Sequence, residues 1–139
     1  MKKVWVLLAM AVGLGLIGCG GSDDAEPLSK AEFKKQATAI CEKSRQERYD
    51  KVDALPKNVQ SNKQELKKLI QSEFIPSFRA MYDELRELNP PEAEAEEFEK
   101  VLASLEAAID KTESNFGETE ALFGANQKVE KMGLAACGF

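Results

Sequence analysis

The sequence predicts an all-α protein, folded as an antiparallel up-and-down bundle of three to four helices and clamped by one disulfide. Apolar residues recur at the three- and four-residue spacing of amphipathic helices through most of the chain. No segment alternates between apolar and polar residues in the way that a half-buried strand does. Two cysteines within the helical region, Cys41 and Cys137, are available for the bridge.

The first 18 residues have the pattern of an export signal. Met1, Lys2 and Lys3 form a short positive segment, and residues 4–17 are apolar apart from glycines. A helix that crosses a membrane needs about 20 apolar residues, whereas a shorter apolar run after a positive segment is typical of a secretory signal. We therefore predict a signal peptide over residues 1–18, with an uncleaved membrane anchor as the alternative.

The end of this segment resembles the bacterial lipobox. In that motif the signal peptidase would recognise Leu16, Ile17 and Gly18, and the thiol of Cys19 would carry a diacylglycerol, with or without a further N-acyl chain. Two acyl chains give stable membrane anchoring, whereas one gives only marginal binding. We expect a mature chain that begins at Cys19 on the outer surface of the membrane, with a flexible acidic tether over residues 19–28 and one helical domain over residues 29–139.

Composition excludes several classes of function. Removing 18 of 139 residues leaves 121, and the loss of Lys2 and Lys3 changes the formal charge from −5 to −7. The remaining Lys and Arg residues are mixed among glutamates, which argues against a nucleic-acid partner. The chain has no histidine, which excludes imidazole bases, Ser-His and Cys-His pairs and His-ligated zinc. We expect no catalytic residue, no metal site and no cofactor besides the lipid on Cys19.

The cysteine count predicts one bridge. After lipidation of Cys19, an even pair remains in an exported domain, and such pairs usually form disulfides. Helix lengths at about 1.5 Å per residue place Cys137 level with Cys41 in an up-and-down path. We predict a Cys41–Cys137 disulfide; two buried free thiols are the alternative.

The first helix is predicted over residues 29–54. Ser29 and Glu32 have the spacing of a capping box, and Leu28 and Phe33 that of a hydrophobic staple. The residues predicted to be buried are Phe33, Ala37, Ile40, Cys41, Ser44, Val52 and Leu55.

The second helix is predicted to begin at a Ser61 cap. Pro76 removes a backbone hydrogen bond within it, so we expect a kink between Ser72 and Pro76. Its apolar stripe consists of Leu66, Leu69, Ile70, Phe74, Phe78, Met81, Leu85 and Leu88.

Two further helices follow a proline corner. Asn89 and Glu92 have capping-box spacing around Pro90 and Pro91, and predict the start of the third helix. Its predicted buried residues are Phe98, Val101, Leu102, Leu105, Ala108, Ile109 and Phe116. A fourth helix is expected from about Glu118 to Met132, ended by Gly133 and Leu134. Its predicted shared face consists of Leu122, Phe123, Val129 and Met132.

Three stretches carry a family resemblance: LSKAEFKKQATAIC at 28–41, LRELNPPEAE at 85–94 and MGLAACG at 132–138. Together with the lipobox, they resemble a family of small exported helical lipoproteins of actinobacterial type. The resemblance spans most of the mature chain and implies export, anchoring and a disulfide, but no activity.

Candidate sites each have a simpler structural interpretation. The acidic run at 92–99 is best read as a solvated helix start, where acids favour the helix dipole, rather than a calcium site. Asp83, Glu84 and Glu87 could supply a glycosidase carboxylate pair, but nothing in the sequence fixes their separation. The phenylalanine and methionine stripe is better explained as core than as a lipid-binding groove.

The function expected from these patterns is binding. We predict a lipid-anchored, non-catalytic interaction or accessory module at the cell envelope, with an unknown envelope protein as partner. A carrier of an apolar ligand between its helices is the alternative, and an enzyme is a third hypothesis.

Overall fold

The computed structural model describes residues 26–56, 62–115 and 120–139. All regular secondary structure in these ranges is helical, which confirms the all-α prediction for them. The elements are α1 (Lys30–Asp53), α2 (Lys63–Leu69), the π-helix η1 (Ile70–Phe74), α3 (Ile75–Arg86), α4 (Glu92–Ser114), α5 (Glu120–Lys131) and the 3-10 helix η2 (Ala135–Cys137).

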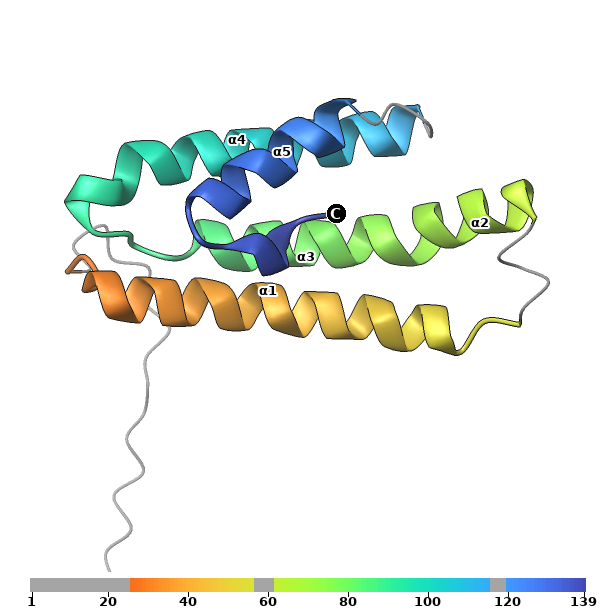
Figure 1. The fold of residues 1–139 in the computed structure, drawn as a ribbon, viewed down its shortest axis with the longest axis horizontal. Helices are drawn as coiled ribbons and strands as arrows, with labels where there is room; N and C mark the ends of the chain where they lie inside the picture. The colour runs from red at the N-terminus through yellow and green to blue at the C-terminus, as the bar shows by residue number, and fades with distance from the viewer. Residues whose placement is uncertain (1–25, 57–61, 116–119) are drawn as a thin grey trace, which may run out of the picture.

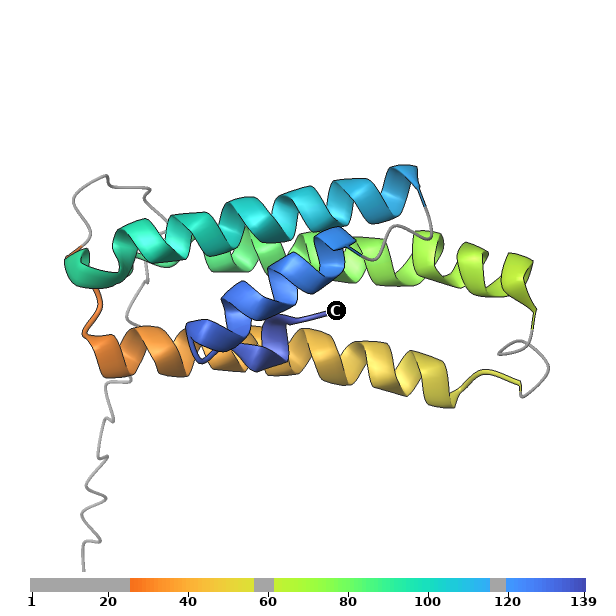
Figure 2. The ribbon, with the colours of Figure 1, turned by 45° about the horizontal axis from the view of Figure 1, so that its top comes forward.

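The helices run back and forth along the long axis of the molecule (Figures 1 and 2). The continuous run from α2 through α3 returns antiparallel to α1, α4 reverses direction again, and α5 lies along α4. The chain then turns back, so that η2 packs against both α1 and α5. This last reversal brings the C-terminal segment, residues 134–139, onto the middle of α1.

The start of α1 forms as predicted. The Glu32 amide donates to Ser29 Oγ over 3.3 Å, and the Ser29 amide donates to Glu32 Oε2 over 3.2 Å, which completes the capping box. Leu28 lies against the core, and its amide donates to the carbonyl of Asn89 over 2.9 Å. The first helix is therefore joined to the corner between α3 and α4 at its first residues.

The second helical run begins one residue later than predicted. Its N-cap is Asn62, whose side-chain oxygen accepts from the Gln64 and Glu65 amides, while Ser61 lies outside the described residues. Near the proline the helix does not break but widens into η1, and the Ile75 amide donates to the Ile70 carbonyl. Pro76 then occupies the first turn of α3, where a missing N–H costs least.

The predicted capping box of the third helix is wrong. The N-cap of α4 is Pro91, which offers no side-chain cap, and α4 begins at Glu92. Asn89 lies two residues before the N-cap position. Its carbonyl instead accepts the hydrogen bond from the Leu28 amide. The other end of α4 is Ser114, so the predicted core residue Phe116 lies outside the described residues.

The end of α5 is a Schellman motif, as the Gly133-Leu134 pattern predicts. Gly133 has a φ of 78°, its amide donates to Glu130, and the Leu134 amide donates to Val129 over 2.7 Å. Leu134 and Val129 are both buried, which supplies the apolar contact of the motif. This turn directs the C-terminal segment back toward α1.

The core is built mainly from the predicted stripes. Phe33 and Phe98 meet edge to face at its centre, with ring centroids 4.8 Å apart. The prediction for Phe123 is wrong, because this side chain is 65% exposed; Ala125 takes the buried position on α5 instead. The fully buried large side chains are Phe33, Met81, Leu85, Phe98, Val101, Leu105, Ile109, Val129 and Leu134, together with both bridging cysteines.

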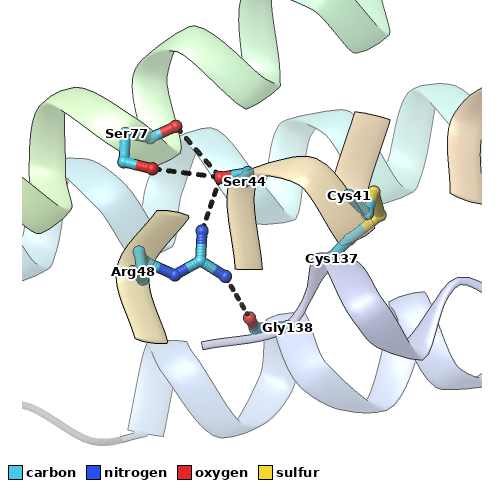
Figure 3. Close-up of a disulfide and its surroundings, with 6 residues drawn as sticks. All are labelled: Cys41, Ser44, Arg48, Ser77, Cys137 and Gly138. Atoms are coloured by element: carbon cyan, nitrogen blue, oxygen red, sulfur yellow. Dashed lines mark hydrogen bonds between the residues drawn. A yellow bond between two sulfur atoms is a disulfide. The ribbon is translucent and has the colours of Figure 1, made fainter. Parts of the chain in front are cut away.

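The predicted cysteine pair meets between α1 and η2. Cys41 and Cys137 lie at disulfide distance, with 4.6 Å between their Cα atoms, and both are fully buried. They are separated by 96 residues in sequence. The pair joins the middle of the first helix to the C-terminal segment (Figure 3).

The two glycines of the α5 region test this turn with opposite signs. Replacing Gly133 by Ala should destabilise the fold by about 1–2 kcal/mol, because an L-residue is strained at positive φ, while the nearest atom to a new Cβ, Lys34 Nζ at 3.6 Å, leaves room for it. Gly124→Ala should stabilise by about 0.5–1 kcal/mol, because a Cβ there meets nothing within 4 Å inside α5. Thermal unfolding by circular dichroism measures both, with Gly124→Ala as the control inside α5; an unchanged or raised melting temperature of Gly133→Ala would contradict this turn.

Candidate functional site

The predicted lipidation site cannot be placed in the fold. Leu16, Ile17, Gly18 and Cys19 all lie outside the described residues, so their roles stay predictions. Within the ranges that the structure describes, no helix combines the length and the apolar character needed to cross a membrane.

The acidic run at the start of α4 is only partly solvated. Glu96 pairs with Lys100 one turn along the helix at the surface, whereas the Glu94 side chain is only 16% exposed. Glu94 Oε1 lies 2.5 Å from Lys30 Nζ of α1, and its Oε2 is buried without a hydrogen-bond partner among the described residues. Among the described residues there is no group of three or more His, Cys, Asp or Glu side chains that could hold a metal ion. The run thus acts locally in joining α1 to α4.

The three carboxylates at the end of the α3 region do not form one site, because they have different neighbours. Glu84 pairs with Lys43 of α1 over 2.9 Å, and Asp83 and Glu87 flank Arg86 at a shallow hollow of the surface. Arg86 also lies over the Tyr82 ring at 5.5 Å. These residues form an exposed charged face on α3.

A second buried charge lies on α1, at a residue that the sequence patterns did not indicate. Arg48 of α1 is only 7% exposed, yet no carboxylate of the described residues forms an ion pair with it. Burial lowers the pKa of its guanidinium to about 10, which still leaves it charged at neutral pH. Buried charges are normally paired, so the groups that replace a counter-ion here need to be identified.

Polar contacts to Arg48 come from α1 and from the C-terminal segment, and one of them continues to α3 (Figure 3). Its Nη1 donates to Ser44 Oγ over 2.6 Å, and its Nη2 donates to the Gly138 carbonyl over 3.4 Å. Ser44 Oγ in turn lies 3.3 Å from the Ser77 carbonyl and 3.1 Å from Ser77 Oγ on α3. The guanidinium therefore links α1, α3 and the C-terminal segment through neutral acceptors.

Aromatic contacts complete the surroundings of the cation. The guanidinium carbon of Arg48 lies 3.9 Å from the centroid of the Phe78 ring, close enough for a cation–π interaction. Phe139 stacks on the same ring, with centroids 4.1 Å apart. Phe78 is thus a shared contact for the cation and for the last residue of the C-terminal segment.

The C-terminal segment is fixed against α5 by Asn126. The Phe139 amide donates to Asn126 Oδ1 over 2.8 Å, and Asn126 Nδ2 donates back to the main-chain oxygen of Phe139 over 3.5 Å. A Cβ on Gly138 would stand 2.7 Å from Asn126 Oδ1, so a larger residue there would displace the side chain that holds Phe139. Cys137, Gly138 and Phe139 therefore hold the segment at three successive positions.

These contacts enclose one side of a pocket of about 210 Å³, which we call the Arg48 pocket. Arg45, Arg48 and Tyr49 line it from α1, Asn126 and Glu130 from α5, and Phe139 from the C-terminal segment. Tyr49 is 57% exposed at this site. The lining includes two guanidinium groups and one carboxylate, so one positive charge is left that can attract a small group with a single negative charge.

Sequence reasoning missed Arg48 although the signal was present. The buried positions of α1 are Phe33, Ala37, Cys41, Ser44 and Arg48, which continue one stripe at steps of three and four. A charged residue on that stripe was passed over because the periodicity was traced through apolar and small residues alone. A long polar side chain on a buried stripe is the signal that would have found it.

Comparisons with known proteins add no further assignment: no family model matches the chain, and searches of curated proteins and of solved structures found no match.

Proposed function

We propose that this protein is a lipid-anchored, non-catalytic binding module on the outer surface of a bacterial membrane, with the Arg48 pocket as its binding site. The lipobox pattern at Leu16–Cys19 supports the anchor, and the resemblance to exported lipoproteins agrees with it. The scaffold in this proposal is an antiparallel helical bundle clamped by the Cys41–Cys137 disulfide.

The buried and unpaired Arg48 beside an open pocket is the observation that carries the binding role. Burying a cation without a counter-charge opposes folding, and neutral hydrogen bonds and one ring compensate it only in part. Arginine and tyrosine are also the side chains most often responsible for binding energy at protein interfaces. Arg45, Arg48 and Tyr49 bring both types to one face of α1.

A carrier of apolar ligands is less well supported. The stripe residues that would line a groove, such as Phe78, Met81 and Leu85, are at most 5% exposed and pack into the core. The Arg48 pocket, at about 210 Å³, is smaller than the range of about 300–1,000 Å³ usual for sites of drug-sized ligands. Its charged wall also disfavours an acyl chain.

The anchor is tested by replacing Cys19 with Ser. Without a thiol no diacylglycerol can be attached, so the variant should move from the detergent phase to the aqueous phase in a Triton X-114 partition. Cys41→Ser is the matched control, since it removes a thiol from the folded region and should leave partitioning unchanged. Retention of the Cys19 variant in the detergent phase would contradict the lipobox interpretation.

The binding role is tested by site-specific photocrosslinking in intact membranes. A benzoylphenylalanine in place of Tyr49 should form a discrete crosslinked product, because this exposed ring borders the Arg48 pocket. The same probe in place of the exposed Gln71 on η1 serves as the control and should form none.

A third probe position tests whether a partner binds at a face other than the Arg48 pocket. Phe123 is the other large exposed apolar side chain of the described residues. Crosslinks from Phe123 alone would move the binding face to α5 and contradict the Arg48 pocket as the site. Absence of crosslinks from all three positions would contradict a binding function.

A further inference from the structure

We propose that the Arg48 pocket binds a carboxylate group, presented by a small organic acid or by the carboxyl end of a peptide. This inference rests on the proposed binding function and names the ligand class of the same site.

The charge balance around Arg48 favours an anionic ligand. A guanidinium has five N–H donors, and the two hydrogen bonds to Ser44 and Gly138 end on neutral oxygens. Arg45 lies three residues earlier on α1 and lines the same pocket, which places both guanidinium groups on one helix face. A ligand with one negative charge would supply the counter-charge that Arg48 lacks among the described residues.

The opposite wall favours a carboxylate over a phosphate. Glu130 of α5 lines the pocket together with Arg45 and Arg48, so the lining side chains carry one net positive charge. A dianionic phosphate would meet more repulsion here than a carboxylate with a single charge. A flat carboxylate also matches the planar fork of a guanidinium group.

The size of the pocket and its aromatic residues indicate what kind of group could be attached to the carboxylate. A volume of about 210 Å³ lies below the range of about 300–1,000 Å³ usual for sites of drug-sized ligands, which suits a small group such as a benzoate ion. Tyr49 and Phe139 both line the pocket and can contact a ring on the ligand. An aromatic carboxylate is therefore the natural probe.

In the direct test, sodium benzoate is added at constant ionic strength to the full-length lipidated protein in detergent micelles. The side-chain Nε–H signals of the arginines are followed by nuclear magnetic resonance. Arg48 and Arg45 should show saturable shifts with one common dissociation constant. Arg86 is the internal control, because it also lies beside a tyrosine, Tyr82, but on an exposed face of α3, and its signal should not saturate.

Two variants separate the role of each arginine. Arg48→Met should abolish the saturable shift at Arg45. Because Arg48 also holds the C-terminal segment, Arg45→Gln gives an independent test at an exposed position. It should keep the fold and weaken benzoate binding by about 1.4-fold to fivefold, the range of exposed charge pairs. Arg86→Gln should leave the dissociation constant unchanged.

The source of the carboxylate is distinguished by a pair of peptides. N-acetyl-glycyl-phenylalanine carries a free carboxylate, and its amide does not. Tighter binding of the free acid than of benzoate would assign the pocket to peptide ends, and tighter binding of benzoate would assign it to small acids. Equal binding of the acid and its amide would contradict recognition of a carboxylate.

Other outcomes would overturn the proposal without ambiguity. Absence of a saturable shift at Arg48 in the unmodified protein would do so, as would tighter binding of inorganic phosphate than of benzoate. Saturation of Arg48 without a crosslink from Tyr49 would keep the pocket as a site for a small acid and contradict a protein partner at this face. A crosslink from Tyr49 without saturation would contradict the carboxylate assignment alone.

Discussion

The attachment of the C-terminal segment to α1 is the constraint on which the candidate site depends. Cys137 meets Cys41 with 4.6 Å between their Cα atoms, and the next residue, Gly138, supplies the carbonyl that Arg48 contacts. Phe139 then stacks on Phe78. Without this attachment, one wall of the Arg48 pocket and one of the polar contacts of the buried guanidinium would be lost together. In the chain-entropy account, a bridge across about 100 residues contributes on the order of 4–5 kcal/mol to stability.

Local turns deliver the segment to that position. The Schellman motif at Gly133 reverses the chain after α5, and the absence of a side chain on Gly138 allows contact with Asn126. The cation of Arg48 is then surrounded by neutral oxygens and a ring rather than by a carboxylate. Such an arrangement keeps a positive charge at the edge of the Arg48 pocket, whereas buried charges in proteins are normally paired with an opposite charge.

Local patterns predicted the helices well, and long-range packing accounts for what they missed. The Ser29 cap, the Gly133 turn and the cysteine pair depend on spacing alone, so they could be identified before the fold was known. The Asn89 cap failed because two prolines separate Asn89 from the first helical residue, and its carbonyl is used by Leu28. Phe123 was expected in the core but is exposed, and Arg48 is buried although no pattern indicated it. Apolar character alone does not fix which residues the C-terminal segment covers. The pocket could not be predicted, since it forms from three elements distant in sequence.

Hydrogen exchange of the C-terminal segment, with and without reductant, tests this attachment most directly. The amides of Cys137, Gly138 and Phe139 all donate within the attached segment or to Asn126. In the oxidised protein they should exchange slowly, and reduction should raise their exchange selectively while the amides of α4 stay protected by the core. Peptide mapping of the unreduced protein identifies the bridge in the same sample. Unchanged exchange at these amides after reduction, or two freely alkylatable thiols before it, would contradict a disulfide-held segment as the basis of the site.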